Sequence, residues 1–339
     1  MNFDFTDDQQ AIKRTANEFL ASRFKPEKRR ELAEAGTYDD GLWGEISELG
    51  WPGIFIDEEH GGQGLGTVEL VILQEELGYA LAPTPFFSNV AAGFVIQQAG
   101  SDEQKERWLP GIASGEARGT VGVVTNGEAP LVPDADSAAL IVLVDGDSAT
   151  VLEASGAEVE QRDTIDSTRR FSSVRANGGG ELLAGDVQAG LDRAEIALAA
   201  ELVGVGQWAL EAAVAYAKDR KQFDRPIGSF QAVAHRCAQM MLEVESARSA
   251  VYYAGWTADN EPETLALAAS MAKAYSADAG WQVTASSLQV HGGIGFTWEH
   301  DLHFFLKRAR TDGYLLGSAR SHRDRVAELA GLSRAAATA

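Results

Sequence analysis

Long helical patterns joined by short links dominate the second half of the chain. The pattern is helical over residues 192–219, 229–257, 261–290 and 301–317, and a shorter tail helix is expected to about Leu332. Long helices with short connections pack antiparallel against one another. This half of the chain therefore predicts a four-helix bundle.

The first half divides into a helical part and a part with strand character. The helical pattern begins with Thr6 as an N-cap and continues through Ile12 and Ala16. Further along, the β-branched run 138–144, an Asp-Gly-Asp turn and residues 149–152 predict a hairpin. The expected fold class is α+β and mainly α, with an N-terminal helical domain (1–115), a reduced β domain (116–185) and a C-terminal helical bundle (186–339).

Composition restricts the classes of partner. The chain has 339 residues, and its 50 acidic against 29 basic residues give a net charge of -21. Such a charge argues against nucleic acid or an anionic membrane surface as a partner. No basic and apolar leader opens the chain and no run approaches the roughly 20 apolar residues of a membrane span, so we expect a cytoplasmic protein. Cys237 is the only cysteine, which excludes an internal disulfide and a cysteine-based metal cluster.

Two segments place residues that are poor core-formers at the ends of long apolar helices. Residues 220–231 read R-K-Q-F-D-R-P-I-G-S-F-Q, and residues 289–301 read Q-V-H-G-G-I-G-F-T-W-E-H-D. An Arg, a Gln and a Gly pair in these places suit a phosphate-linked adenine cofactor. In length and order the two segments resemble the C-terminal signature of the acyl-CoA dehydrogenase family.

The resemblance implies that FAD lies between the β domain and the bundle, with its far half held by a neighbouring subunit. It assigns to the cofactor Arg220, Phe223, Gln231, Gln289, Gly292 and Gly293. Arg220 would contact the pyrophosphate, with Phe223 beside it and Gln231 near the adenine. Gln289, Gly292 and Gly293 would let the backbone close on the nucleotide of the adjoining subunit. Each also has a purely structural alternative, as a cation at a helix end, a cap or a helix stop.

The reaction that the resemblance implies is α,β-dehydrogenation of an acyl-CoA thioester. A carboxylate removes the α-proton, a hydride passes to the flavin, and an electron-transfer flavoprotein takes the electrons. The base has to be a carboxylate whose pKa is raised by an apolar pocket. Most relatives carry this Glu in a turn that corresponds here to residues 314–318, where Leu316 occupies its place.

Two other carboxylates are candidates for the base. A second branch of the family uses a Glu near the start of the first bundle helix; gapless counting places that position on Ala194, next to Glu195. Glu201 is the only charge between Glu195 and Glu211, so we expect it to be at least partly buried. Six residues apart on a helix, the two candidates face different directions. The alternatives are a solvated first-turn acid for Glu195, and for Glu201 a buried pair with a bundle cation such as Arg236 or Lys273.

The β domain also departs from the family. Relatives carry a T-E-P-G-x-G-S-D loop around the flavin, whereas this chain offers V-V-T-N-G-E-A-P over residues 123–130, and full-length relatives are several tens of residues longer. A short chain without the usual base fits a heteromeric assembly in which it completes the flavin site of a full-length partner. A self-sufficient homo-oligomeric dehydrogenase that uses Glu201 or Glu195 stays open, and so does a non-enzymatic helical scaffold.

Other residues suggest less specific chemistry. A flavin oxidase or monooxygenase of the same fold would place His291 or Ser318 where the base is expected. His300 and His303 superficially resemble a metal cluster, but the template places them in a loop and at a helix start, so we expect no metal. A basic patch near the C-terminus, formed by His322, Arg323 and Arg325, suits either CoA phosphates or a solvated helix end.

Overall fold

The computed structural model describes residues 5–332. Its first part is helical and consists of α1 (Asp7–Arg23), α2 (Pro26–Ala35), α3 (Asp40–Glu48), α4 (Thr67–Ala80), α5 (Phe86–Ala99) and α6 (Asp102–Ser114). Thr6 caps α1 in a capping box with Gln9, as its position before an acidic first turn predicts. Most residues of α4 and α5 are buried on every side, since these two helices lie between the other N-terminal helices and the bundle.

The middle of the chain forms two small sheets. The strands are β1 (Gly119–Val123), β2 (Ala129–Pro133), β3 (Leu140–Asp145), β4 (Ser148–Glu153), β5 (Ala157–Arg162), β6 (Phe171–Ala176) and β7 (Glu181–Leu183). One sheet has the order β1-β3-β4-β7 and the other β2-β6-β5. The predicted hairpin is present as the antiparallel pair β3 and β4, which meet at Asp145 and Ser148. Strand β5 escaped prediction because most of its residues are exposed and charged or polar.

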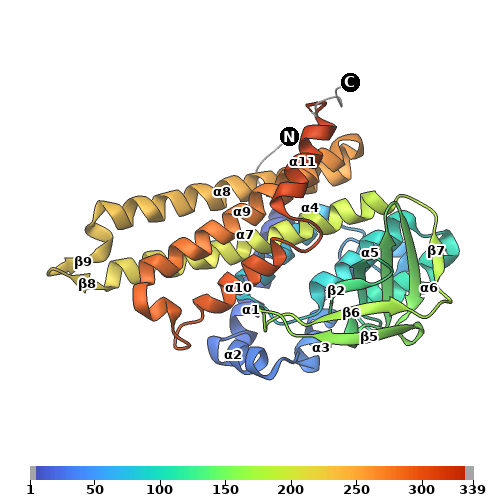
Figure 1. Ribbon diagram of the computed structural model, residues 1–339, viewed down its shortest axis with the longest axis horizontal. Coiled ribbons are helices and arrows are strands. Elements are labelled where there is room, and N and C mark those ends of the chain that lie inside the picture. Colours follow the sequence, from blue (N-terminus) through green and yellow to red (C-terminus); the bar gives the residue numbers. More distant parts are fainter. Residues whose placement is uncertain (1–4, 333–339) are drawn as a thin grey trace.

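The last part is the helical bundle. It contains α7 (Val187–Asp219), the small hairpin β8 (Lys221–Gln222) and β9 (Arg225–Pro226), α8 (Gln231–Asn260), α9 (Leu265–His291), α10 (Leu302–Asp312) and α11 (Ala319–Leu329). Figure 1 shows α7, α8 and α9 as long neighbouring rods whose β8–β9 end lies far from the two sheets. Helix α10 ends at Asp312, before the predicted residue 317, and Leu316 in the turn that follows has a left-handed backbone conformation.

Helices α4 and α7 approach each other at two glycines. A Cβ added to Gly78 would lie 2.2 Å from the backbone oxygen of Glu201, and one added to Gly204 would lie 1.9 Å from that of Glu75. Both distances are far below van der Waals contact, so only glycine permits this approach. The close crossing fixes α7 against the N-terminal helices.

The expected fold class, α+β and mainly α with a C-terminal helical bundle, is confirmed. The three domain boundaries stay a prediction. Among the described residues, α7 is long and apolar enough to cross a membrane, but 78% of its apolar window is buried inside the fold. Most of its apolar surface is therefore covered by the other elements of the protein.

Candidate active site

A cavity of about 640 Å³ lies between the sheets and the bundle. Most of its wall is apolar, and the lining includes Val121, Val123, Leu131, Ile165, Phe171, Leu191, Leu315 and Leu316. Glu195 is the only carboxylic acid among the residues that line it, and Arg310 is the only basic one. The arrangement is a single acid in an apolar chamber.

Glu195 is held in the part of α7 nearest the sheets, where it is 5% exposed. Burial, together with the negative charge of Asp192, raises the pKa of Glu195 to about 8, although Arg325 and Lys273 oppose the shift. Nη1 of Arg325 lies 3.5 Å from Oε2 of Glu195, and Nδ1 of His322 lies 3.8 Å from the same oxygen. A carboxyl group with such a pKa can take up a proton near neutral pH.

The loop after α10 brings Leu316 to the same cavity. Leu316 has a φ of 56°, a conformation that leucine rarely adopts and that costs about 1–2 kcal/mol. Two buried side chains hold it there. His322 donates from Nε2 to the carbonyl oxygen of Leu316 at 3.0 Å, and Lys273 donates from Nζ to those of Asp312 and Gly317 at 3.0 and 3.1 Å.

Glu201 has a different environment and does not belong to the residues that line the cavity. Burial tends to raise the pKa of Glu201, but the guanidinium groups of Arg169 and Arg308 lower it below its usual value. Arg169 lies 2.8 Å from Glu201, Arg308 also forms an ion pair with it, and Gln74 donates to it at 2.7 Å. A carboxylate held in this way is a poor proton acceptor.

Glu201 forms the buried ion pair that was named as the alternative to a catalytic role, but its partners are not the two cations suggested, Arg236 and Lys273. Arg236 is exposed on α8, and Lys273 is occupied by the backbone carbonyls near Leu316. The actual partners come from the segment before β6 and from α10, more than 30 and more than 100 residues away along the chain. They in turn pair with Asp312 and Asp166, so the network is a closed, buried set of charges.

The six residues assigned to FAD all lie at the β8–β9 end of the bundle. Arg220 ends α7, Gln231 begins α8, and Phe223 is 87% exposed in the hairpin between them. Gln289 is in the last turn of α9, and Gly292, with a φ of 62°, ends this helix next to the exposed Gly293. None of the six lines the cavity of the same chain. Their role at a cofactor stays a prediction, and it requires the site of another subunit.

A smaller cleft of about 310 Å³ adjoins the cavity through Arg310 and Tyr314, which line both. Arg320, Arg323 and Trp281 also line it. The cleft reaches the first turn of α11, and the N-terminal end of a helix favours an anion. Sequence reasoning missed Arg310 and Arg320, because isolated arginines on helices carry no motif.

The predicted C-terminal basic patch does not exist as a surface feature. His322 is 4% exposed, and the half-buried Arg325 donates to Asp192 of α7 at 2.6 Å. Only Arg323 is exposed, where it forms an ion pair with Asp278. The periodicity of a helix places His322 and Arg325, three residues apart, on the side that faces Glu195, and it turns Arg323 to another side.

The residues named for other chemistries lie elsewhere. His291 stacks on Tyr216 at the β8–β9 end of the bundle, and the side chain of Ser318 accepts from the backbone N–H of Ser321 in the first turn of α11. Within residues 5–332, no group of three His, Cys, Asp or Glu side chains is placed to hold a metal ion. Burial lowers the pKa of His303 to about 4, with a further contribution from Lys307.

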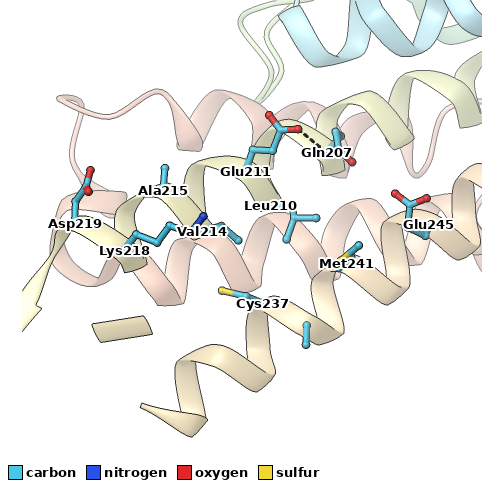
Figure 2. Close-up of a pocket in the computed structure, with 11 residues that line it drawn as sticks. Gln207, Leu210, Glu211, Val214, Ala215, Lys218, Asp219, Cys237, Met241 and Glu245 are labelled. Atoms are coloured by element: carbon cyan, nitrogen blue, oxygen red, sulfur yellow. Dashed lines mark hydrogen bonds between the residues drawn. The ribbon is translucent and has the colours of Figure 1, made fainter. Parts of the chain in front are cut away.

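A third hollow is an open groove of about 700 Å³ between α7 and α8. Figure 2 shows Cys237 and Met241 of α8 facing Leu210 and Val214 of α7 across it. Burial raises the pKa of Cys237, so its thiol stays protonated and unreactive. The groove has no acid and base in contact that could carry a reaction.

Comparison with known proteins identifies one family over most of the chain. The model for the acyl-CoA dehydrogenase N-terminal domain matches residues 6–116, and that for the acyl-CoA dehydrogenase C-terminal domain matches residues 185–330. Acyl-CoA dehydrogenase IpdE2 of Mycolicibacterium smegmatis is 34% identical over 95% of this chain and 98% of its own length. The protein of the same name from Mycobacterium tuberculosis is 32% identical over 93% of this chain and 94% of its own.

Solved structures agree with this result. The Tcur3481–Tcur3483 steroid ACAD has a TM-score of 0.88 and 26% identity, with 96% of this chain and 98% of that chain covered. The ChsE4–ChsE5 complex from Mycobacterium tuberculosis has a TM-score of 0.90 over 99% of this chain and 100% of that chain. At 24% identity, the second comparison shows a shared fold.

Proposed function

The chain belongs to the acyl-CoA dehydrogenase family, and on that premise we propose that it is a subunit of an FAD-dependent enzyme that introduces an α,β double bond into an acyl-CoA thioester. The observation that carries the proposal is the single buried carboxyl group, Glu195, in an apolar cavity between the sheets and the bundle. Its raised pKa suits removal of a weakly acidic α-proton. Family members are flavoproteins, which makes FAD the cofactor to test.

The cavity and the adjoining cleft fit the two chemical halves of FAD. The apolar walls suit a flat ring system together with an acyl chain. Arg310, Arg320 and the first turn of α11 suit a pyrophosphate, because guanidinium groups and helix N-termini both favour phosphate oxygens. When bound, FAD would supply the hydride acceptor. Arg220 of a neighbouring subunit would also contact the pyrophosphate, and Gln231 and the glycine pair of a neighbouring subunit would hold the nucleotide end.

In the proposed reaction the chain contributes a base and a dry environment. Glu195 in its ionised form takes the α-proton onto a carboxylate oxygen. The apolar walls, including Leu191 and Leu316, exclude water that would otherwise compete for that proton. We propose that the electrons finally pass to an electron-transfer flavoprotein and that the protein acts in the cytoplasm.

A second candidate is a non-catalytic subunit that completes the flavin site of a full-length partner. Leu316 supports it, since an aliphatic side chain stands where the resemblance places the usual Glu. The V-V-T-N-G-E-A-P segment supports it as well, because it lacks the flavin loop of longer relatives. Two structures of similar fold bear the names of two proteins each, Tcur3481–Tcur3483 and ChsE4–ChsE5. We propose a tetramer that consists either of four copies of this chain or of this chain together with a second acyl-CoA dehydrogenase subunit.

Flavin content and one substitution separate these candidates. The chain is expressed alone and together with a neighbouring acyl-CoA dehydrogenase gene, and flavin is measured per chain. One flavin per two chains in the mixed assembly with almost none for the chain alone supports the heteromer, and one per chain alone rejects it. Glu195→Gln is then introduced into the flavin-containing assembly, with Glu211→Gln, an exposed acid on the same helix, as control.

Loss of turnover by about 10²–10⁴ in Glu195→Gln but not in Glu211→Gln supports Glu195 as the base. Full turnover in Glu195→Gln would show that Glu195 is not the base. The second candidate, a non-catalytic subunit, would then remain. Flavin content has to stay unchanged in both variants. Otherwise the loss reports on cofactor binding.

A further inference from the structure

Glu195 faces two side chains of α11 that suit opposite protonation states of a carboxyl group. We propose that Arg325 holds Glu195 as a carboxylate, and that His322 holds it as a carboxylic acid after it has taken a proton. His322 is then a positioning residue that stabilises the protonated base. The inference rests on the proposed function in taking Glu195 as the base, and neither α11 residue lines the cavity.

The hydrogen bond to Leu316 determines which nitrogen of His322 carries the proton. A carbonyl oxygen only accepts, so the Nε2 atom 3.0 Å from it has to donate. In the neutral ring Nδ1 is then a bare acceptor. Within the described part of the chain this buried Nδ1 has no hydrogen-bond partner, and Oε2 of Glu195 lies 3.8 Å away.

The distance of 3.8 Å has a direct chemical meaning. A carboxylate oxygen and a bare ring nitrogen are both acceptors, and two acceptors cannot form a hydrogen bond. Once Glu195 carries a proton, its O–H can donate to Nδ1 of His322. A movement of about 1 Å brings the two atoms to hydrogen-bond distance. A separation of 3.8 Å is thus compatible with an ionised Glu195, whereas the closed contact requires its protonation.

Arg325 is suited to the other state. Its Nη1 donates to Oδ1 of Asp192 at 2.6 Å and to Oγ of Ser270 at 3.1 Å, and reaches Oε2 of Glu195 only at 3.5 Å. A guanidinium group that is mainly engaged elsewhere holds the carboxylate loosely. Glu195 can therefore leave Arg325 for His322 without breaking a short ion pair.

The other charges around Glu195 come from three further directions. Asp192 faces it from the same helix and Lys273 from α9, while Arg310 of α10 lines the same cavity. Burial lowers the pKa of His322 to about 4, helped by the charges of Lys273 and Arg325. The ring is therefore neutral at physiological pH and acts as an acceptor.

The proton balance is simple. The α C–H bond breaks, its proton passes to a carboxylate oxygen of Glu195, and its electron pair stays on the substrate. His322 gains no proton in this step and only accepts a hydrogen bond. The contact stabilises the acid form, so it makes Glu195 a stronger base.

The test is an infrared pH titration of the purified flavin-containing assembly. The C=O band of protonated Glu195 is assigned by its loss in Glu195→Gln. His322→Phe keeps a ring but removes both nitrogens, and His322→Gln is measured in its place if that variant does not fold. Asp324→Asn, an exposed neighbour on α11, is the control.

We expect the midpoint of the band to fall by about half a unit to one unit in the His322 variant and to stay unchanged in Asp324→Asn. The pH at which kcat/KM rises should fall by the same amount. An unchanged or raised midpoint in a folded variant overturns the inference, even if Glu195→Gln abolishes turnover. If Glu195→Gln retains turnover, the proposed base fails, while the titration still decides whether His322 accepts from Glu195.

Discussion

Arg169 and Glu201 form a buried ion pair, with 2.8 Å between Nη2 and Oε2, that ties the segment before β6 to the middle of α7. Arg308 of α10 joins the same carboxylate. Thr164 and Ile165, which precede Asp166 of the same buried network, line the cavity. Thr311, which precedes Asp312 of the network, lines it as well. The buried charges therefore fix both sides of the cavity wall, although Glu201 itself is not among its lining residues.

Replacing Glu201 with Gln is expected to destabilise the protein strongly. The change leaves the guanidinium groups of Arg169 and Arg308 without their shared carboxylate in the interior, which typically costs about 3–5 kcal/mol of unfolding free energy. Denaturant unfolding measures the loss. Glu128→Gln breaks an exposed ion pair with Arg175 and should change the unfolding free energy far less, because exposed ion pairs contribute little to stability. Equal effects of the two variants would contradict the buried network.

Turnover should depend on pH through Glu195. Burial raises its pKa to about 8, and only the ionised form accepts the α-proton. We expect kcat/KM to rise about tenfold per pH unit up to a plateau above about pH 8. A profile that is flat between pH 6 and 9 would contradict this role.

The same group should make stability depend on pH in the opposite direction. Glu195 has a pKa raised from 4.5 to about 8, so the folded state binds more protons than the unfolded state between these values. Its contribution is fully present below the lower pKa and is lost as pH rises through the upper one, with a slope of at most about 1.4 kcal/mol per pH unit. The measurement is the unfolding free energy of Glu195→Gln and of the wild-type chain at pH values from 5 to 9. The variant should lack this slope.

Alanine at position 204 should be poorly tolerated. Its Cβ would lie 1.9 Å from the backbone oxygen of Glu75, so α4 and α7 would have to separate. We expect a loss of several kcal/mol in unfolding free energy, in the range of severe core overpacking. Gly44→Ala in α3, where a Cβ meets nothing within 4 Å, is the matched control and should be neutral or stabilising by up to about 1 kcal/mol.

Arg220→Ala should lower the amount of FAD per chain while leaving the bundle folded. Arg220 is exposed at the end of α7, so its removal costs little packing, whereas a pyrophosphate would lose a bidentate partner. Flavin absorbance per chain and thermal unfolding measure the two effects. Arg236→Ala, an exposed arginine on α8, is the control. Full flavin occupancy in Arg220→Ala would count against the assignment.

Local patterns were enough to predict the main elements of the fold. The long helices of the bundle and the hairpin of β3 and β4 follow from periodicity and turn residues that lie within one segment. The family resemblance likewise depends on two continuous stretches, 220–231 and 289–301. Strand β5 and the early end of α10 were missed, because the first is stabilised by pairing with β6 and the second by Lys273 and His322.

Patterns along the chain were sufficient to infer the class of fold, the family and two candidate acids. The choice between Glu195 and Glu201 required the three-dimensional arrangement. The ionisation of a buried carboxyl group depends on which distant charges surround it, and no pattern along one helix carries that information. Arg169 and Arg308 reach Glu201 and keep it charged, whereas Glu195 faces an apolar cavity and has only distant contacts with His322 and Arg325 behind it.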